Sequence, residues 1–367
     1  MSGLAPSACA QRTLAEAIGS RGNGFNLVRL LAALAVVVFH SYQLNTLGAD
    51  AADPLTRVLL PVLDLGSVAV GVFFMVSGVF ITQSWMNDPH ALRFAARRVA
   101  RIVPGLLVCS LTTVVMAVVF FSGPGWAGLL DWAPWRYVLG NTVLHGLVYD
   151  IAPQELRLPG VLLGQDLNGP LWTLYWEGRM YVMVALMGLA AVVPLRQWMG
   201  WCGLFLLVAA QLLPAVLSGF VWEVRLWSLF LVGVLLQVGS NSIRVGPAVV
   251  VCAALLVAMN WTRNAALTPN GFTNFGVSLF FGALALWVGT AVRTNSRVMQ
   301  HIGRHDYSYS VYIYHWPLIL MLRAALPPMG PLALLATTLA VLAPIALCSW
   351  HWIEAPALAR MRGLLAK

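Results

Sequence analysis

An arginine and a histidine stand at the two ends of one apolar segment. The stretch RLLAALAVVVFH, Arg29 to His40, places ten uncharged residues between them. On a helix this separation is three turns plus about 20°, or roughly 16 Å of rise, so both side chains share one face at different depths. Either Arg29 reaches the lipid headgroups and His40 is a neutral core residue, or both line one polar cavity in which the imidazole accepts a proton.

A carboxylate lies on a similar apolar segment in mid-chain. The stretch NGPLWTLYWEGRMY begins with a turn at Asn168, after which Thr173, Glu177 and Tyr181 recur every four residues on one helix face. An ionised group at this depth is costly and indicates a partner or a function. Glu177 can pair with Arg179 or with an arginine of a neighbouring helix, or it can orient the histidine or hold an acceptor substrate.

Four arginines precede another apolar segment. In RFAARRVARIVP, a helix would gather them within an arc of about 140°; they are Arg93, Arg97, Arg98 and Arg101. Such a cluster is either a topological anchor or an anion site for a phosphorylated ligand, for which convergent guanidinium groups are suited.

Two further motifs carry small or titratable side chains. In YSYSVYIYHWP, Ser308 and His315 lie seven residues apart, close to one helix face, with Tyr312 nearby; an aromatic belt with an incidental histidine is the alternative. In GVFFMVSGVFIT, Ser77 and Gly78 either allow close helix packing or belong to a passage for a narrow ligand.

The composition shows what must position these groups. About 60% of the 367 residues are apolar and 10% are charged, so we interpret the chain as an integral membrane protein without a sizeable soluble domain. The five cysteines have no paired spacing, which predicts neither a disulfide framework nor a metal site.

Apolar windows predict an all-α polytopic protein with about ten transmembrane helices. They lie near 24–46, 66–86, 102–121, 172–193, 201–219, 225–239, 247–261, 274–292, 307–326 and 332–350.

Basic residues gather at the termini and on alternate connections, which predicts that both termini are cytoplasmic. The net charge of +9 follows from this bias and requires no nucleic-acid partner. We predict a cytoplasmic segment 1–22, a transmembrane domain 23–356 and a cytoplasmic tail 357–367.

The ordered set of motifs resembles the acyltransferase 3 family of membrane proteins. It comprises RLLAALAVVVFH, FFMVSGVFIT, RRVARIVP, NGPLWTLYWEGRMY, YSYSVYIYHWP and a final WIEAP, and it runs from about residue 23 to 356. The chain looks like a stand-alone form without a fused hydrolase-like domain. It departs from the commoner pattern of the family at Val79 and at Tyr175-Trp176. These departures put in doubt the shape of the family's substrate tunnel and the fit of the acceptor.

The resemblance implies transfer of an acyl group, usually acetyl, from cytoplasmic acyl-CoA to a hydroxyl of an O-antigen or exopolysaccharide sugar at the bacterial inner membrane. Family motifs map onto nine residues: Arg29, His40, Arg97, Arg98, Arg101, Glu177, Tyr181, His315 and Glu354. From these and their neighbours we assign three groups: catalytic His40, Glu177 and Arg29; acetyl-CoA-binding Arg97, Arg98, Arg101, Ser77 and His315; acceptor-binding Tyr181, Trp172 and Asn168. No metal is expected.

The implied chemistry explains a titratable group at membrane depth. A thioester is already activated, so the enzyme must exclude water, take the hydroxyl proton and stabilise the oxyanion. His40 can serve as general base or as a covalent acyl carrier. The alternatives are a proton-coupled transporter or flippase that uses the same residues as a relay, and a binding protein without turnover. The acceptor sugar, acyl chain and oligomeric state are not predicted.

Overall fold

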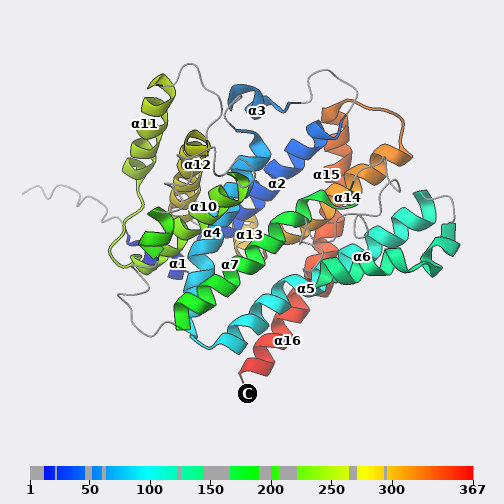
Figure 1. The fold of residues 1–367 in the computed structure, drawn as a ribbon, viewed down its shortest axis with the longest axis horizontal. Coiled ribbons are helices and arrows are strands. Elements are labelled where there is room, and N and C mark those ends of the chain that lie inside the picture. The colour runs from blue at the N-terminus through cyan, green and yellow to red at the C-terminus, as the bar shows by residue number, and fades with distance from the viewer. Residues whose placement is uncertain are drawn as a thin grey trace, which may run out of the picture.

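The computed structural model describes residues 12–20, 23–45, 52–59, 63–121, 125–143, 166–189, 200–205, 221–263, 271–292 and 296–366. Within these ranges every regular element is helical (Figure 1). The elements before residue 144 are α1 (Leu14–Gly19), α2 (Phe25–Gln43), α3 (Pro54–Leu59), α4 (Leu65–Asn87), α5 (Ala91–Phe121), η1 (Gly125–Leu130) and α6 (Trp132–Thr142). The later ones are η2 (Gly169–Leu171), α7 (Trp172–Leu189), α10 (Val221–Val238), α11 (Pro247–Arg263), α12 (Gly271–Ala291), α13 (Arg297–Arg304), α14 (Ser308–Ala325), α15 (Pro331–Ser349), η3 (Trp350–Glu354) and α16 (Ala355–Leu365).

The helices follow the predicted spans closely. Helices α2, α4, α5, α7, α10, α11, α12, α14 and α15 overlap nine of them, and the predicted span 201–219 lies mostly outside the described residues. Among the described residues, four stretches are long and apolar enough to cross a membrane: Phe25–Gln43, Leu65–Asn87, Ala91–Phe121 and Pro331–Leu365. The prediction of a helical membrane protein is confirmed. The count of ten, the location of the termini and the domain bounds at 23 and 356 stay predictions.

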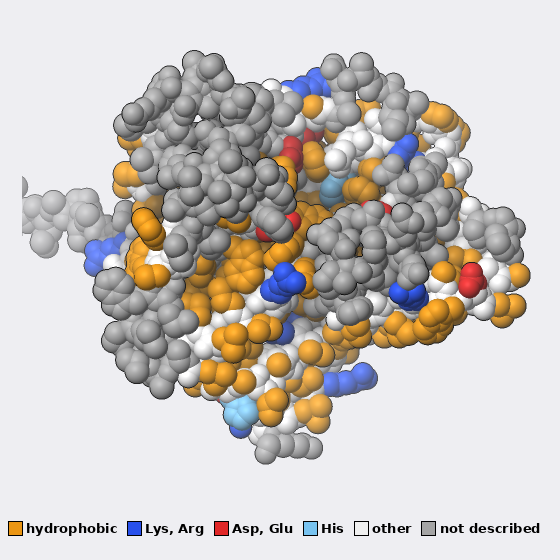
Figure 2. Space-filling model, in the orientation of Figure 1, with side chains coloured by type: hydrophobic (Ala, Val, Ile, Leu, Met, Phe, Trp, Pro, Cys, Tyr) orange, Lys and Arg blue, Asp and Glu red, His pale blue; other side chains and the backbone are white. Residues whose placement is uncertain are grey.

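The outer surface suits a hydrocarbon environment. On the face seen in Figure 2, apolar side chains cover most of the described surface and basic side chains are scattered. Large apolar residues such as Leu31 on α2, Met116 on α5 and Leu186 on α7 are exposed in the isolated chain. Lipid tails would cover these residues, which makes their exposure inexpensive.

Helices α4 and α10 pack closely against each other at two glycines. A Cβ atom on Gly78 would lie 2.2 Å from the carbonyl oxygen of Phe230, and one on Gly233 would lie 2.2 Å from that of Met75. Only residues without a side chain allow this approach, as in other small-residue contacts between membrane helices. The structure therefore supports the packing interpretation for Gly78.

A proline in α14 explains how the mid-chain turn is attached. Pro317 has no N–H, so it cannot donate to the carbonyl of Ile313, four residues earlier. The Asn168 amide donates to this carbonyl at 2.8 Å, and the Cys109 thiol donates to it at 3.2 Å. The buried carbonyl is thereby satisfied, and the η2–α7 turn is fixed against α14.

Candidate active site: an arginine pocket and a histidine pair

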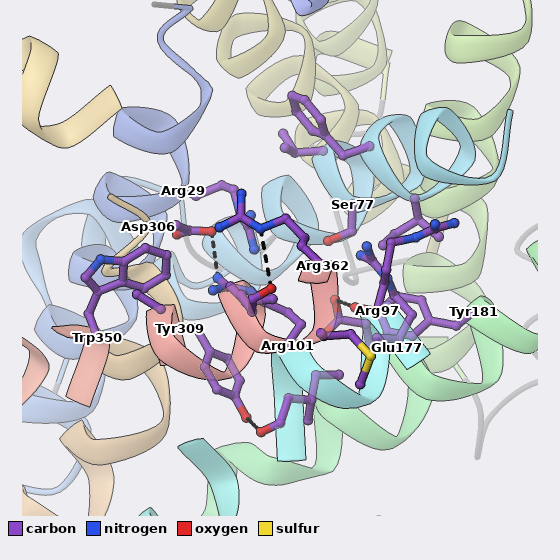
Figure 3. A pocket seen from close by; sticks show the side chains of 18 of the residues that line it. Arg29, Ser77, Arg97, Arg101, Glu177, Tyr181, Asp306, Tyr309, Trp350 and Arg362 are labelled. Atoms are coloured by element: carbon purple, nitrogen blue, oxygen red, sulfur yellow. Dashed lines mark hydrogen bonds and ion pairs between the residues drawn. The ribbon is translucent and has the colours of Figure 1, made fainter. Parts of the chain in front are cut away.

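One end of the helix bundle encloses a strongly basic pocket of about 440 Å³. Its lining brings together seven of the predicted site residues: Arg29, Ser77, Arg97, Arg98, Arg101, Glu177 and Tyr181. In Figure 3, Arg29, Asp306 and Trp350 lie on one side, and Arg97, Glu177 and Tyr181 lie on the other. Six arginines against two carboxylates, Glu177 and Asp306, line this pocket, which suits it to a polyanion.

Asp306 holds two of the arginines in place. It lies on the turn between α13 and α14, and its Oδ2 atom accepts hydrogen bonds at 2.6 Å from both Arg29 and Arg101. Burial raises the pKa of Asp306, but the two guanidinium groups and hydrogen bonds from Ser308 outweigh this effect and lower it to about 2. Asp306 therefore stays ionised and sets the geometry of the basic cluster.

Arg101 has a second carboxylate partner. The π-helical turn η3 presents Glu354, which is 1% exposed, with its Oε2 atom 3.5 Å from Arg101. The hydroxyls of Ser349 and Ser310 donate to the other oxygen of Glu354. Arg101 is thus part of a buried ion-pair network that links α5, α14 and η3.

Arg97 and Arg93 share a carboxylate at the start of α5. Arg97 donates to Asp88 at 2.6 Å, and Arg93 lies 3.6 Å from the same side chain. The hydrogen bond from Arg97 lowers the pKa of Asp88, which keeps it charged. Arg97 therefore binds Asp88 and also lines the pocket, and the anchor and anion-site interpretations of the cluster both stay predictions.

Arg98 is bound more weakly than its neighbours. Its guanidinium lies 5.7 Å from the ring centres of Phe94 and Tyr181, and it donates to the Ser84 hydroxyl at 3.4 Å. Within the described part of the chain, its Nε atom has no partner and no carboxylate lies within ion-pair distance. Arg98 therefore retains hydrogen-bonding capacity for a ligand.

Glu177 faces the pocket and accepts a hydrogen bond from Tyr181, one turn later. Arg179 instead stacks on the rings of Tyr175 and Trp176, at 4.0 and 4.8 Å. Glu177 therefore does not form the predicted alternative ion pair with Arg179.

A narrower cavity of about 50 Å³ shares Arg29, Ser77 and Glu177 with the pocket. It is also lined by Phe73 and Tyr312. Ser77 thus fits the passage interpretation of its motif, in contrast to the neighbouring Gly78.

His40 and His315 form a hydrogen-bonded pair between α2 and α14. His40 Nδ1 lies 2.7 Å from His315 Nε2, and the rings are nearly parallel with centres 5.0 Å apart. Trp316 meets the His40 ring edge-on at 4.8 Å. His315 is fully buried, whereas His40 keeps partial exposure.

The hydrogen bonds of the pair determine which nitrogen atoms carry protons. His315 Nδ1 lies 2.6 Å from the Tyr312 carbonyl oxygen, which can only accept, so this nitrogen carries the proton. His315 Nε2 is then the acceptor, and His40 Nδ1 is the donor. In the neutral pair, the lone pair of His40 Nε2 is left unprotonated, as a general base requires.

The remaining predicted site residues lie near this pair. Asn168 and Trp172 belong to the η2–α7 turn, where Gly169 packs against Trp316. His315 does not line the arginine pocket, so its predicted contact with the donor gains no support from the geometry.

Comparison with known proteins identifies the family of this chain. The acyltransferase domain family model matches residues 23–352. The chain belongs to the acyltransferase 3 family. It is 25% identical to an O-acetyl transferase of Shigella phage Sf6, over 81% of this chain and 84% of that one. It is 28% identical to the acyltransferase MdmB of Streptomyces mycarofaciens, over 80% and 77%, and 27% identical to nodulation protein 10 of Rhizobium leguminosarum bv. viciae, over 49% and 46%. No solved structure matches.

This acyltransferase has pocket residues that sequence reasoning missed. Asp306, Arg304, Arg362 and Trp350 all line the pocket. An acidic residue at the start of the YSYS motif, next to a basic span end, was a usable signal for Asp306. For Trp350, no pattern in the sequence indicated a role. Among the described residues, no group of three or more His, Cys, Asp or Glu is placed to hold a metal ion.

Proposed function

We propose that this acyltransferase moves an acetyl or other short acyl group from acyl-CoA to a hydroxyl of an envelope or exported glycan. The orientation of the His40–His315 pair supports this proposal best, because it leaves His40 Nε2 free to take a proton. Membership in the family favours acyl transfer over proton-coupled transport by the same residues.

In the proposed reaction, the acceptor hydroxyl oxygen attacks the thioester carbonyl carbon while His40 Nε2 takes the hydroxyl proton. The carbon–sulfur bond then breaks, and the proton passes to the thiolate of CoA. His315 accepts a hydrogen bond from the other nitrogen of His40, so it orients the ring and stabilises the imidazolium. His315 is thus proposed as a positioning residue rather than a donor ligand.

The donor would enter through the arginine pocket. Arg98, Arg97 and Arg101 would face its phosphates, and Ser77 and Glu177 would line the path of the thioester arm toward Tyr312. The six arginines that line one pocket with two carboxylates favour a polyphosphorylated donor such as acetyl-CoA.

The acceptor would approach His40 from the other side of the pair. Trp172 and Asn168 remain candidates for acceptor binding, because they lie on the turn that packs against Trp316. Tyr181 lines the arginine pocket, which favours a role on the donor side instead. With basic ends cytoplasmic, the enzyme would reside in the bacterial inner membrane and acylate a sugar destined for the outside.

The test is transfer of radiolabel from acetyl-CoA to envelope glycans by the purified protein in lipid nanodiscs. His40→Ala should reduce transfer by about 10²–10⁴-fold, as loss of a general base does, while acetyl-CoA binding by calorimetry is retained. His90→Ala, on an exposed histidine outside the pair, serves as the matched control.

Two variants of His315 distinguish a role in positioning His40 from a role in packing. His315→Gln keeps a side-chain oxygen that can accept from His40, so it should retain more activity than His315→Leu. Near-normal transfer by His40→Ala would refute the mechanism. Acid-labile label on His40 in the absence of acceptor would replace the base route by a covalent one.

A further inference from the structure

Five aromatic rings form a cluster beside the arginine pocket, here named the stack after its nearly parallel members, and the proposed function gives them no role. They are His301, His305, Tyr307, Trp350 and His351. His305 lies at the centre, with its ring centre 4.3 Å from His301, 5.7 Å from Tyr307 and 5.3 Å from His351. The plane of Tyr307 is within 25° of the planes of His301 and His305. The rings of His301 and His351 are tilted by 37° and 54° against His305, and Trp350 meets His305 edge-on.

Residues of the stack are sequence neighbours of residues that line the pocket. Arg304, Asp306 and Trp350 line the pocket. His305 lies between the first two in the sequence, and His351 follows the third. Figure 3 shows the Trp350 indole at the edge of the pocket, next to Asp306. Trp350 is the ring of the five that lines the pocket, and the ring centres of Tyr307 and His305 lie 6.1 and 6.3 Å from its own, so Trp350 joins the other rings to the pocket.

Hydrogen bonds fix the stack from inside. The Tyr307 hydroxyl lies 2.8 Å from His301 Nε2 and 3.1 Å from His351 Nε2. His305 Nδ1 donates to the His301 carbonyl at 2.8 Å, which anchors its ring to the end of α13. The platform is thus ordered before any ligand arrives, which lowers the entropy cost of binding.

The stack is also incomplete. His301 and His351 are exposed, although they rest on buried Tyr307. Trp350 is 8% exposed, and its indole N–H has no hydrogen-bond partner among the described residues. A structural aromatic cluster would cover its rings and satisfy this donor. Within the described chain these histidines are not placed to bind a metal.

We propose that this stack is a platform for the purine base of the donor nucleotide, whose phosphates bind the neighbouring arginines. The inference rests on the proposed acyl-CoA donor and adds the recognition of its nucleotide. A purine presents a flat π-face that stacks on aromatic and imidazole rings, and its ring nitrogens accept hydrogen bonds of the kind the Trp350 N–H offers. The basic pocket would bind the phosphates of a nucleotide, and the ring platform would bind its base.

The experiment compares two donors that differ only in the nucleotide. Acetyl-CoA carries 3′-phosphoadenosine 5′-monophosphate, and acetyl-4′-phosphopantetheine lacks this purine nucleotide with its two phosphates. Binding of each to the purified full chain is measured by calorimetry for wild type, His305→Ala and His351→Ala. We expect the variants to weaken acetyl-CoA binding by about 5- to 150-fold, as loss of one base-stacking contact does, and to leave binding of the shorter donor unchanged.

Two further variants separate stacking from folding. His305→Phe keeps a ring and should retain most of the affinity, whereas a purely structural role of the histidine hydrogen bond predicts the same loss as His305→Ala. His90→Ala removes an exposed imidazole just before α5, outside the stack, and serves as the control.

The outcomes distinguish this inference from the proposed function. Equal loss for both donors, or no loss in either alanine variant, overturns the purine platform and leaves the donor proposal standing. Wild-type protein that binds neither donor overturns the proposed donor itself.

Discussion

Arg101 and Arg98 lie three residues apart on α5, yet removal of Arg101 should mainly reduce stability and removal of Arg98 should mainly reduce acetyl-CoA binding. Arg101 contacts Asp306 and Glu354, both buried, whereas Arg98 has no carboxylate within ion-pair distance among the described residues. Arg101→Ala leaves Glu354 with only hydroxyl partners among the described residues, and it leaves Asp306 with Arg29 and the hydrogen bonds from Ser308. Breaking a buried pair from one side costs about 3–5 kcal/mol, because an uncompensated charge remains.

Thermal unfolding in detergent, together with acetyl-CoA calorimetry, separates the two roles. Arg101→Ala should lower the unfolding midpoint strongly. Arg98→Ala should leave that midpoint near wild type and weaken acetyl-CoA binding by about ten-fold or more, given about 1.5–3 kcal/mol for a charge-assisted hydrogen bond. Arg93→Ala is the control, because its exposed contact with Asp88 at 3.6 Å is worth less than about 1 kcal/mol. If Arg101→Ala unfolds at the temperature of Arg93→Ala, the network does not stabilise the fold and the reasoning fails.

Two more predictions concern stability. Asp306→Asn should cost about 2 kcal/mol at neutral pH, because the pKa of Asp306 falls from 3.8 to about 2 on folding. A lowered pKa stabilises the fold above pH 4, so the gap in unfolding midpoint between wild type and variant should shrink as pH falls from about 4 to 2; a gap that stays constant down to pH 2 contradicts the assignment. Gly78→Ala should destabilise the protein by about 1–3 kcal/mol and reduce the folded fraction on gel filtration, because the added Cβ meets the Phe230 carbonyl oxygen at 2.2 Å. Gly276→Ala on α12, whose Cβ would have no neighbour within 4 Å, should be neutral or stabilising, and equal losses in both variants would rule out the close approach.

The sequence predicts helices better than it predicts contacts. The window 24–46 corresponds to α2, since apolar runs of this length have few alternatives in a membrane. The window 102–121 misses the first turns of α5, which begins at Ala91, because arginine favours helix while lowering hydropathy. Helical spacing predicts one arc for four arginines, of which Arg97, Arg98 and Arg101 line the pocket, whereas Arg93 is not among its lining residues.

The partners of these groups were not predictable from local pattern. Arg29 meets Asp306, and His40 meets His315, across more than 270 residues of chain. Such pairs depend on which helix faces pack together, and neither periodicity nor charge counts specify this for a bundle. The π-helical turn that brings Glu354 to Arg101 likewise has no signature in WHWIE.

The hydrogen-bonded chain behind His40 ends on the main chain, at the carbonyl oxygen of residue 312. Every amino acid supplies this oxygen, so no side-chain replacement at that position can delete it. The protonation pattern of the His40–His315 pair therefore depends on the two imidazoles and on a main-chain oxygen that a side-chain replacement does not remove. Replacement of Tyr312 would remove the hydrogen bonds of its hydroxyl with Thr173 and with the Pro170 carbonyl, but it would leave the main-chain acceptor of His315 in place.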